Sequence, residues 1–207
     1  MIAYQTVEKE AIAEFAEKRS RFIGCAKPVK TEEEAVAFIN SVKSKNWNAT
    51  HNVYAYSIRE GQVKRYSDDG EPQGTAGIPV LDVIVKSGVV DTAVVVTRYF
   101  GGILLGAGGL VRAYSHGASI ALEQARVITM RACLMAELCC DYSQYGRLSA
   151  LIPESGGTVD HADFTDCVKI SFHMSDEDMR AFDQKLADAT SGQSKAEITG
   201  EKFFKFL

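Results

Sequence analysis

The chain has 207 residues, of which 46% are hydrophobic and 24% charged, with a formal net charge of -4. This composition provides a hydrophobic core, and the length is somewhat large for one compact domain, so we expect two domains, 1–128 and 129–207. Acidic residues near the N-terminus exclude a signal peptide, and no apolar run reaches membrane-spanning length. We therefore expect a cytoplasmic protein that does not contact a membrane.

Charge is distributed unevenly between the two expected domains. Residues 1–128 contain 15 Lys and Arg against 14 Asp and Glu, whereas residues 129–207 contain 8 against 13. The first part is therefore the better candidate to meet a polyanion. A sequence pI of about 5.6 argues against a protein that coats RNA through bulk charge.

The first predicted elements are a strand and a helix. An apolar-rich run over 19–29 ends at a proline and predicts a strand. Residues 31–45 predict an amphipathic helix in which Thr31 is the N-cap and Glu34 completes a capping box.

The next segment predicts a hairpin followed by a helix. Residues 52–59 and 62–67 flank the dipeptide Glu60-Gly61, which suits a tight turn. Residues 75–88 predict a helix that Thr75 caps and Gly88 ends.

A β-branched run over 92–100 is typical of a central strand. The helix predicted after it spans 109–125. Its expected apolar face consists of Leu110, Val111, Tyr114, Ala118 and Leu122.

The remainder of the chain predicts the order β-α-β-β-α-β. The six expected elements are a strand at 130–141, a helix at 143–152, strands at 158–163 and 166–173, a helix at 176–189 and a strand at 195–204. This order is that of a ferredoxin-like domain, in which two helices cover one face of an antiparallel sheet.

Five cysteines are present, an odd number without a C-x-x-C motif: Cys25, Cys133, Cys139, Cys140 and Cys167. This spacing predicts neither a disulfide framework nor a zinc site. We interpret all five as small buried hydrophobic residues in a reducing compartment.

A glycine-rich stretch lies between the strand at 92–100 and the following helix, an arrangement that directs backbone N–H groups and a helix dipole at one point. Gly101 and Gly106 have the G-x-x-x-x-G spacing, but Ala107 and Gly108 stand where a nucleotide-binding loop needs Lys and Ser or Thr. The nucleotide motifs are therefore excluded. Two interpretations remain open: an anion cradle, or glycines that supply positive φ and close packing.

Acidic residues cluster in the loop before the helix at 75–88. Asp68, Asp69 and Glu71 lie within four residues, close enough for a metal site or for acid and base catalysis. Loop acids beside glycine are also common turn-formers. His51 is either a structural hydrogen-bonding group or a nearby base, and no complete triad or metal-ligand set can be assembled.

Arginine and aromatic side chains flank both loops. Arg65-Tyr66 precede the acidic loop, Arg98 lies just before the glycines, and Arg112 follows them on the helix. Guanidinium groups with stacking rings beside exposed amides suit single-stranded RNA or a phosphorylated ligand. In the alternative, the aromatic rings belong to the core and the arginines pair with the loop acids.

The segments "YSDDGEPQGTAGIP" and "VVVTRYFGGILLGAGGLVRAYS", with "RSRFI" and "HNVYAY" upstream, resemble the bacterial YigZ-type branch of the IMPACT family. The later segment "CDYSQYGRL" is similar to the second domain of that branch. The resemblance implies an α+β protein. Its first domain would be an α/β sandwich like the second domain of ribosomal protein S5 and domain IV of elongation factor G, and its second would be a ferredoxin-like domain similar to domain V of that factor.

The glycine-rich turn with its flanking arginines, together with the implied pair of domains, leads us to expect a non-catalytic, translation-linked regulatory protein that binds RNA, the ribosome or a phosphate-bearing partner. We expect no metal and no cofactor. Two alternatives stay open: an enzyme that uses one of the loop acids as acid or base, and a protein–protein adaptor. The expected binding residues are Arg98, Gly101, Gly102, Gly106, Gly108, Gly109, Arg112, Asp68, Asp69, Glu71, Arg65 and His51.

Overall fold

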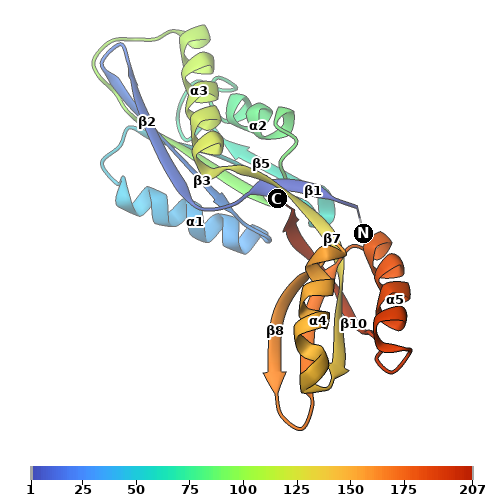
Figure 1. Ribbon diagram of the computed structural model, residues 1–207. Coiled ribbons are helices and arrows are strands. Elements are labelled where there is room, and N and C mark those ends of the chain that lie inside the picture. The colour runs from blue at the N-terminus through green and yellow to red at the C-terminus, as the bar shows by residue number, and fades with distance from the viewer. Residues whose placement is uncertain (1, 207) are drawn as a thin grey trace. The chain divides into compact units, whose positions relative to one another are not determined.

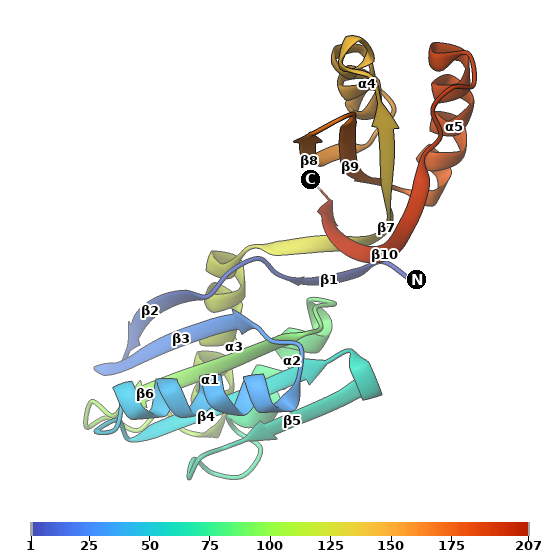
Figure 2. The same ribbon diagram turned by 90° about the horizontal axis from the view of Figure 1, so that it is seen from below.

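The computed structural model describes residues 2–206. The chain divides into two compact units, Tyr4–Thr129 and Met130–Phe206, the second together with residues 2 and 3. Each unit has its own hydrophobic core, and the ribbon can be followed in Figures 1 and 2. No helix in the described range is long and apolar enough to cross a membrane.

The first unit contains an antiparallel sheet with the strand order β2-β3-β6-β4-β5. Its strands are β2 (Ala11–Glu17), β3 (Ser20–Pro28), β4 (His51–Ile58), β5 (Val63–Ser67) and β6 (Thr92–Tyr99). The β-branched run in β6 is central, as predicted, and seven of its eight residues are buried. A strand with side chains buried on both faces requires a layer of helices on each side.

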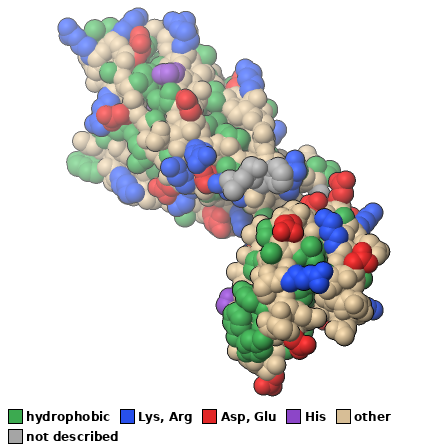
Figure 3. Space-filling model, in the orientation of Figure 1, with side chains coloured by type: hydrophobic (Ala, Val, Ile, Leu, Met, Phe, Trp, Pro, Cys, Tyr) green, Lys and Arg blue, Asp and Glu red, His purple; other side chains and the backbone are tan. Residues whose placement is uncertain are grey.

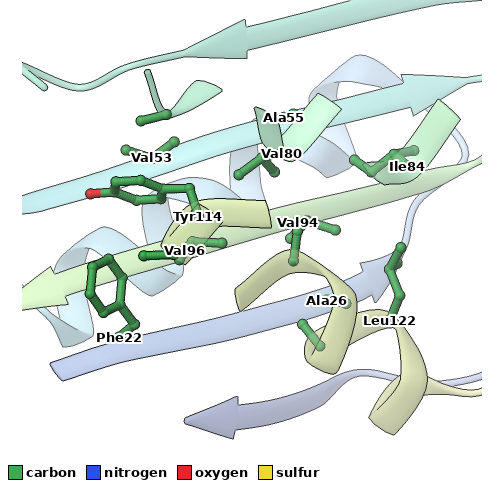
Figure 4. Close-up of a cluster of buried hydrophobic side chains, with 14 of the residues drawn as sticks. Phe22, Ala26, Val53, Ala55, Val80, Ile84, Val94, Val96, Tyr114 and Leu122 are labelled. Carbon is green, nitrogen blue, oxygen red and sulfur yellow. The ribbon is translucent and has the colours of Figure 1, made fainter. Parts of the chain in front are cut away.

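Helix α1 (Glu32–Lys45) covers one face of this sheet, and α2 (Gly77–Lys86) and α3 (Ala107–Ala125) cover the other (Figures 1 and 2). Alternate residues of β6 divide between the two layers: Val95 packs with the α1 side, and Val94 and Val96 pack with α2 and α3. Figure 4 shows the larger cluster, in which the Tyr114 ring lies close to Phe22, Val53 and Val96. The predicted α/β sandwich is confirmed.

The predicted N-cap of α1 is confirmed, because Thr31 Oγ1 accepts a hydrogen bond from the Glu34 N–H at 3.2 Å. The Glu34 carboxylate accepts from the Lys30 N–H at 2.7 Å instead of closing the predicted capping box onto Thr31. The predicted cap of α2 is wrong: the helix begins at Gly77, and Thr75 Oγ1 instead donates to the Pro72 carbonyl at 2.6 Å. Val111 was also misplaced, since it is exposed beside the buried row that starts at Leu110.

Two strands were not expected from the sequence: β1 (Tyr4–Val7) and β2 (Ala11–Glu17). β2 is an edge strand with no fully buried residue, so its apolar alternation is weak. An edge strand forms mainly because it pairs with a neighbouring strand, here β3, and less because of its own composition.

The second unit has the predicted order of strands and helices. Its elements are β7 (Val127–Cys140), α4 (Tyr142–Glu154), β8 (Thr158–Phe164), β9 (Val168–Met174), α5 (Asp176–Thr190) and β10 (Glu197–Phe206). β7 lies between β10 and β9, β8 lies beside β9, and β1 also pairs with β7. Among the unit's own strands this is the ferredoxin-like arrangement, so the prediction is confirmed.

One face of the second sheet is apolar and packs with both helices, through residues such as Ile170, Phe172 and Phe182. Whether a cysteine is buried depends on the face of the sheet to which its side chain points. Cys140 and Cys25 are buried as expected, but Cys139 is exposed, and Cys133 and Cys167 are partly exposed. The interpretation of all five as buried was therefore wrong, because neighbouring residues of a strand point to opposite faces.

Helix α3 approaches β3 and β6 so closely that glycines are needed at two contacts. A Cβ atom on Gly24 would lie 2.2 Å from the Gly117 carbonyl oxygen, and one on Gly117 would lie 2.8 Å from a Val96 methyl group. We expect Gly24→Ala to lower the free energy of unfolding by about 2–3 kcal/mol, because the helix must move away from the sheet. Urea unfolding measures the change.

Gly146→Ala is the control for this substitution. Gly146 lies in α4 with nothing within 4 Å of the added Cβ, so the change stabilises the protein by up to about 1 kcal/mol. A Gly24→Ala protein as stable as the wild type would contradict the close contact between β3 and α3.

Candidate functional site

A cavity of about 420 Å³ lies in the first unit where four segments meet. The segments are the start of β4, the loop after β5, the end of β6, and the loop that leads into α3. The lining residues are Thr50, His51, Gly70, Glu71, Pro72, Arg98, Phe100, Leu104, Leu105, Gly106, Ala107 and Leu110. Mostly apolar walls with a few polar groups are typical of a ligand site of this size.

Glu71 is the buried acid of the cavity, with 7% of its surface exposed. Arg98 Nη1 and the Tyr114 hydroxyl both donate to its Oε1 atom, each at 2.7 Å. A carboxylate is buried at low cost only when charged or hydrogen-bonding partners compensate its lost hydration. The acidic loop is thereby joined to the central strand and to α3.

Arg98 is equally buried, with 5% of its surface exposed. Its guanidinium carbon lies over two rings, 5.7 Å from the centre of Phe22 and 5.3 Å from that of Phe100. Its Nη2 atom reaches Ser20 Oγ at 3.5 Å, whereas the buried Nε atom has no hydrogen-bond partner. An unsatisfied buried donor is uncommon and marks a place where a ligand acceptor or water can bind.

His51 is held in one tautomer by the loop. Its Nδ1 atom lies 2.9 Å from the backbone oxygen of Asp69. Because a carbonyl oxygen can only accept, Nδ1 carries a proton, and Nε2 is the atom that can accept one. That Nε2 atom lies 3.8 Å from Glu71 Oε1.

The other two loop acids shape the backbone. Asp68 accepts hydrogen bonds from the N–H groups of Gly74, Ala76 and Gly77 at 2.9, 3.1 and 2.7 Å, and so caps the start of α2. Asp69 accepts from the Asn52 N–H at 2.6 Å and pairs with Lys43 at 2.7 Å. Neither residue lines the cavity.

The glycines between β6 and the first turn of α3 have different structural roles. Gly101 lies against the backbone of Arg19, where a Cβ would be 2.0 Å from the carbonyl oxygen. Gly102 and Gly106 have positive φ of 84° and 73° in open space. Gly108 and Gly109 belong to the first turn of α3, which has no side-chain cap.

The start of α3 is therefore available to an anion. The Leu110 N–H donates to the Gly106 carbonyl and makes the first bond of the helix, so the N–H groups of residues 107–109 have no partner within it. Gly106 and Ala107 line the cavity. Anions are favoured at such an end by the amides and by the helix dipole.

The remaining predicted arginines lie outside the cavity lining. Arg112 is exposed, and a Cβ on Gly108 would lie 3.7 Å from its Nη1 atom, which places the guanidinium beside the first turn of α3. Arg65 is exposed on β5 and bonds the Lys64 carbonyl at 3.0 Å.

Of the expected site residues, the cavity brings together His51, Glu71, Arg98 and Gly106. Sequence reasoning missed the bond from Tyr114 to Glu71. The sequence gives only a weak indication of this bond. A tyrosine on the buried face of a helix, unlike a phenylalanine, has a hydroxyl that needs a partner. Among the described residues, no group of three or more His, Cys, Asp or Glu could hold a metal ion.

The network predicts a pH dependence. Burial raises the pKa of Tyr114, and the hydrogen bond to Glu71 raises it further. The protonated phenol thus stabilises the folded protein fully below the unfolded pKa of about 10, and this contribution is lost as the pH rises above that value. We expect Tyr114→Phe to cost about 1–2 kcal/mol at neutral pH and to flatten the loss of stability above pH ~10.

Urea unfolding from neutral to alkaline pH measures both effects. The pKa of Tyr56 is also raised, to about 12, chiefly by burial, so part of the alkaline loss remains in the variant. Tyr66→Phe, at an exposed ring, is the control for loss of a hydroxyl at neutral pH. An alkaline profile of Tyr114→Phe as steep as that of the wild type would contradict this role of the buried phenol.

Two family models match the chain. The Impact N-terminal domain matches residues 18–122, and a domain of unknown function (DUF1949) matches residues 138–193. A solved structure described as the crystal structure of an hypothetical protein covers 97% of this chain and 98% of its own, with a TM-score of 0.61 and 32% identity.

Several curated relatives carry the same family name. IMPACT family member YvyE of Bacillus subtilis is 38% identical over 193 residues, 93% of this chain and 89% of that protein. IMPACT family member YigZ of Escherichia coli is 38% identical over 180 residues, 84% of this chain and 87% of that protein. Protein IMPACT of Xenopus laevis matches 44% of this chain and 30% of its own length at 35% identity. With both units and nearly the full length matched, this chain belongs to the IMPACT family.

Proposed function

We propose that the chain is a cytoplasmic, translation-linked binding protein that takes a phosphate-bearing segment of single-stranded RNA at the cavity of its first unit. One observation carries this proposal. An uncapped helix start and a buried guanidinium with an unpaired N–H border the same cavity. Both attract the oxygen atoms of a phosphate group.

The charges of the cavity favour an anion despite Glu71. The negative charge of that carboxylate is already compensated by Arg98 and Tyr114 within the protein. The amides of residues 107–109 and the exposed guanidinium of Arg112 add positive potential at the start of α3. A phosphate at this end therefore meets a favourable field without displacing an internal ion pair.

The rim offers apolar surface for a base. Phe100 is 45% exposed and Leu104 82% exposed, and both residues line the cavity. Stacking of bases on exposed rings gives binding that tolerates any sequence. An exposed ring next to a phosphate site is the combination that single-stranded RNA uses.

Arg98 has a different part from the one expected of a surface arginine. It is buried against Glu71, so it holds the acidic loop in place, and its Nε atom is buried without a hydrogen-bond partner. Its removal leaves a buried carboxylate with one charged partner fewer, at a cost of about 3–5 kcal/mol. Arg112 is the better candidate for a phosphate contact at the surface.

The proposed binding is local and does not depend on bulk charge. On the face drawn in Figure 3, Lys and Arg side chains of the first unit are interspersed with Asp and Glu and form no single basic field. Few counterions would be released on binding, so the salt dependence is expected to be shallow. The link to translation rests on the resemblance of both units to domains of elongation factor G.

The substitution Ala107→Asp tests the phosphate site. The added carboxylate lies at the first residue of α3, where it satisfies the helix amides and repels a phosphate, yet it favours the helix itself. We expect at least about tenfold weaker binding of a fluorescein-labelled oligoribonucleotide of about ten nucleotides, with no loss of thermal stability. Fluorescence anisotropy at two salt concentrations gives the affinities.

Ala107→Asn is the matched control, because it has the same shape without the charge. It should bind the oligonucleotide within about twofold of the wild type. Equal binding by both variants would show that the start of α3 is not the phosphate site. A wild-type protein that binds neither the oligonucleotide nor ribosomes in co-sedimentation would reject RNA and favour a protein partner at Phe100 and Leu104.

A second candidate function is acid–base catalysis at the same cavity. The bond to the Asp69 carbonyl leaves His51 Nε2 as the group that can accept a proton beside Glu71 and the proposed phosphate site. A histidine in this position could activate water for hydrolysis of a phosphodiester. Of the three loop acids, Glu71 is the one that lines the cavity, whereas Asp68 and Asp69 bind backbone N–H groups outside it.

The substitution His51→Asn separates catalysis from binding. Its amide group can still donate to the Asp69 carbonyl, so the loop is preserved. If the protein hydrolyses bis(p-nitrophenyl) phosphate, the variant should lose at least about a hundredfold in rate while its affinity for the oligonucleotide stays unchanged. Absence of turnover by a wild-type protein that binds the oligonucleotide would reject the hydrolytic candidate.

A further inference from the structure

Two cysteines far apart in the sequence meet on the second sheet. Cys139 lies near the end of β7, and Cys167 comes directly before β9. Cys139 is opposite Lys169 in the register, so Cys167 lies two positions away on the same side of the sheet. The two Sγ atoms are 2.7 Å apart.

Both thiols are accessible from the face of the sheet that the helices leave uncovered. Leu138, Cys140 and Val168, the neighbours in the chain, are buried in the core on the other face. Cys139 is exposed and Cys167 partly exposed. Cys139 also lines a cavity of about 440 Å³ with Lys169 and residues 192–195. A small oxidant can therefore reach this pair.

The surroundings distinguish the two thiols. The pKa of Cys167 is raised, chiefly by the hydrogen bond to Cys139, so Cys167 stays protonated to a higher pH. Cys139 is the more exposed of the two thiols and lines the cavity, so an incoming disulfide reaches it first. Cys139 is thus the attacking thiol and Cys167 the resolving one.

We propose that Cys139 and Cys167 are a reversible redox modification site, which closes to an intramolecular disulfide by exchange with low-molecular-weight disulfides such as oxidised glutathione. The Cys139 thiolate attacks one sulfur of oxidised glutathione, which forms a mixed disulfide and releases one glutathione thiolate. Cys167 then loses its proton to solvent and attacks Cys139 Sγ, which releases the second glutathione. The two cysteines lose two electrons, and the glutathione disulfide gains them.

The other cysteines cannot take part without rearrangement. Cys25 and Cys140 are buried, Cys133 is partly exposed, and burial raises the pKa of all three thiols. None of the three is hydrogen-bonded to a second sulfur in the described range. The site therefore consists of one pair, and its closure would tie the turn between β8 and β9 to β7.

Mass spectrometry of the whole native protein tests the proposal. The reduced chain is incubated with oxidised glutathione at pH about 8, quenched with acid and alkylated. Before alkylation, we expect the oxidised chain to be lighter by about 2 Da, for the loss of two hydrogens, and after alkylation it should carry two alkyl groups fewer than the reduced control, with no lasting glutathione adduct. Peptide mapping should find the link between Cys139 and Cys167, and reduced glutathione should reverse it.

Two single variants identify the order of events. Cys167→Ser should accumulate a stable glutathione adduct at Cys139, because the resolving thiol is absent, whereas Cys139→Ser should react much more slowly. Three results with the wild type would overturn the proposal: a lasting adduct at Cys139, a disulfide that involves another cysteine, or a chain that stays reduced at about a hundredfold excess of oxidised over reduced glutathione.

Discussion

The first unit depends on one buried ion pair, between Glu71 and Arg98. A carboxylate with 7% of its surface exposed must be compensated within the protein, and its partners come from β6 and α3. This requirement joins three segments that are far apart in the chain. The loop between β5 and α2, the end of the central strand and the first half of α3 therefore cannot move independently of one another.

The same ion pair sets what the neighbouring cavity can bind. Because Arg98 and Tyr114 already compensate Glu71, the positive groups left for a ligand are the N–H groups at the start of α3, one N–H of Arg98 and the exposed guanidinium of Arg112. An apolar rim beside these groups favours a ligand that has both a phosphate and a flat base. In the proposed function, the buried and the exposed arginine therefore have separate tasks: Arg98 holds the site and Arg112 contacts the ligand.

A different constraint acts on the second unit: helices cover only one face of its sheet, and successive residues of a strand point to opposite faces. Its inward residues form the core with α4 and α5, while the outward residues of β9, Lys169, Ser171 and His173, are polar. Cys139 and Cys167 belong to the outward set, and strand register brings their sulfur atoms together. The sequence does not indicate this pairing, because the two cysteines are 28 residues apart.

By itself, the sequence determined the features that depend on local spacing: the cap and apolar face of α1, the hairpin of β4 and β5, the central strand β6, and the ferredoxin-like order of the second unit. These can be read because hydrophobic periodicity and turn residues act within a few positions of one another. Tertiary structure alone decided the edge strand β2, the capping of α2 by Asp68, the burial of Arg98, its pairing with Glu71 and Tyr114, and the meeting of Cys139 with Cys167. Each of these contacts joins residues that are distant in the chain or depends on strand pairing, so it exists only once the sheets have formed.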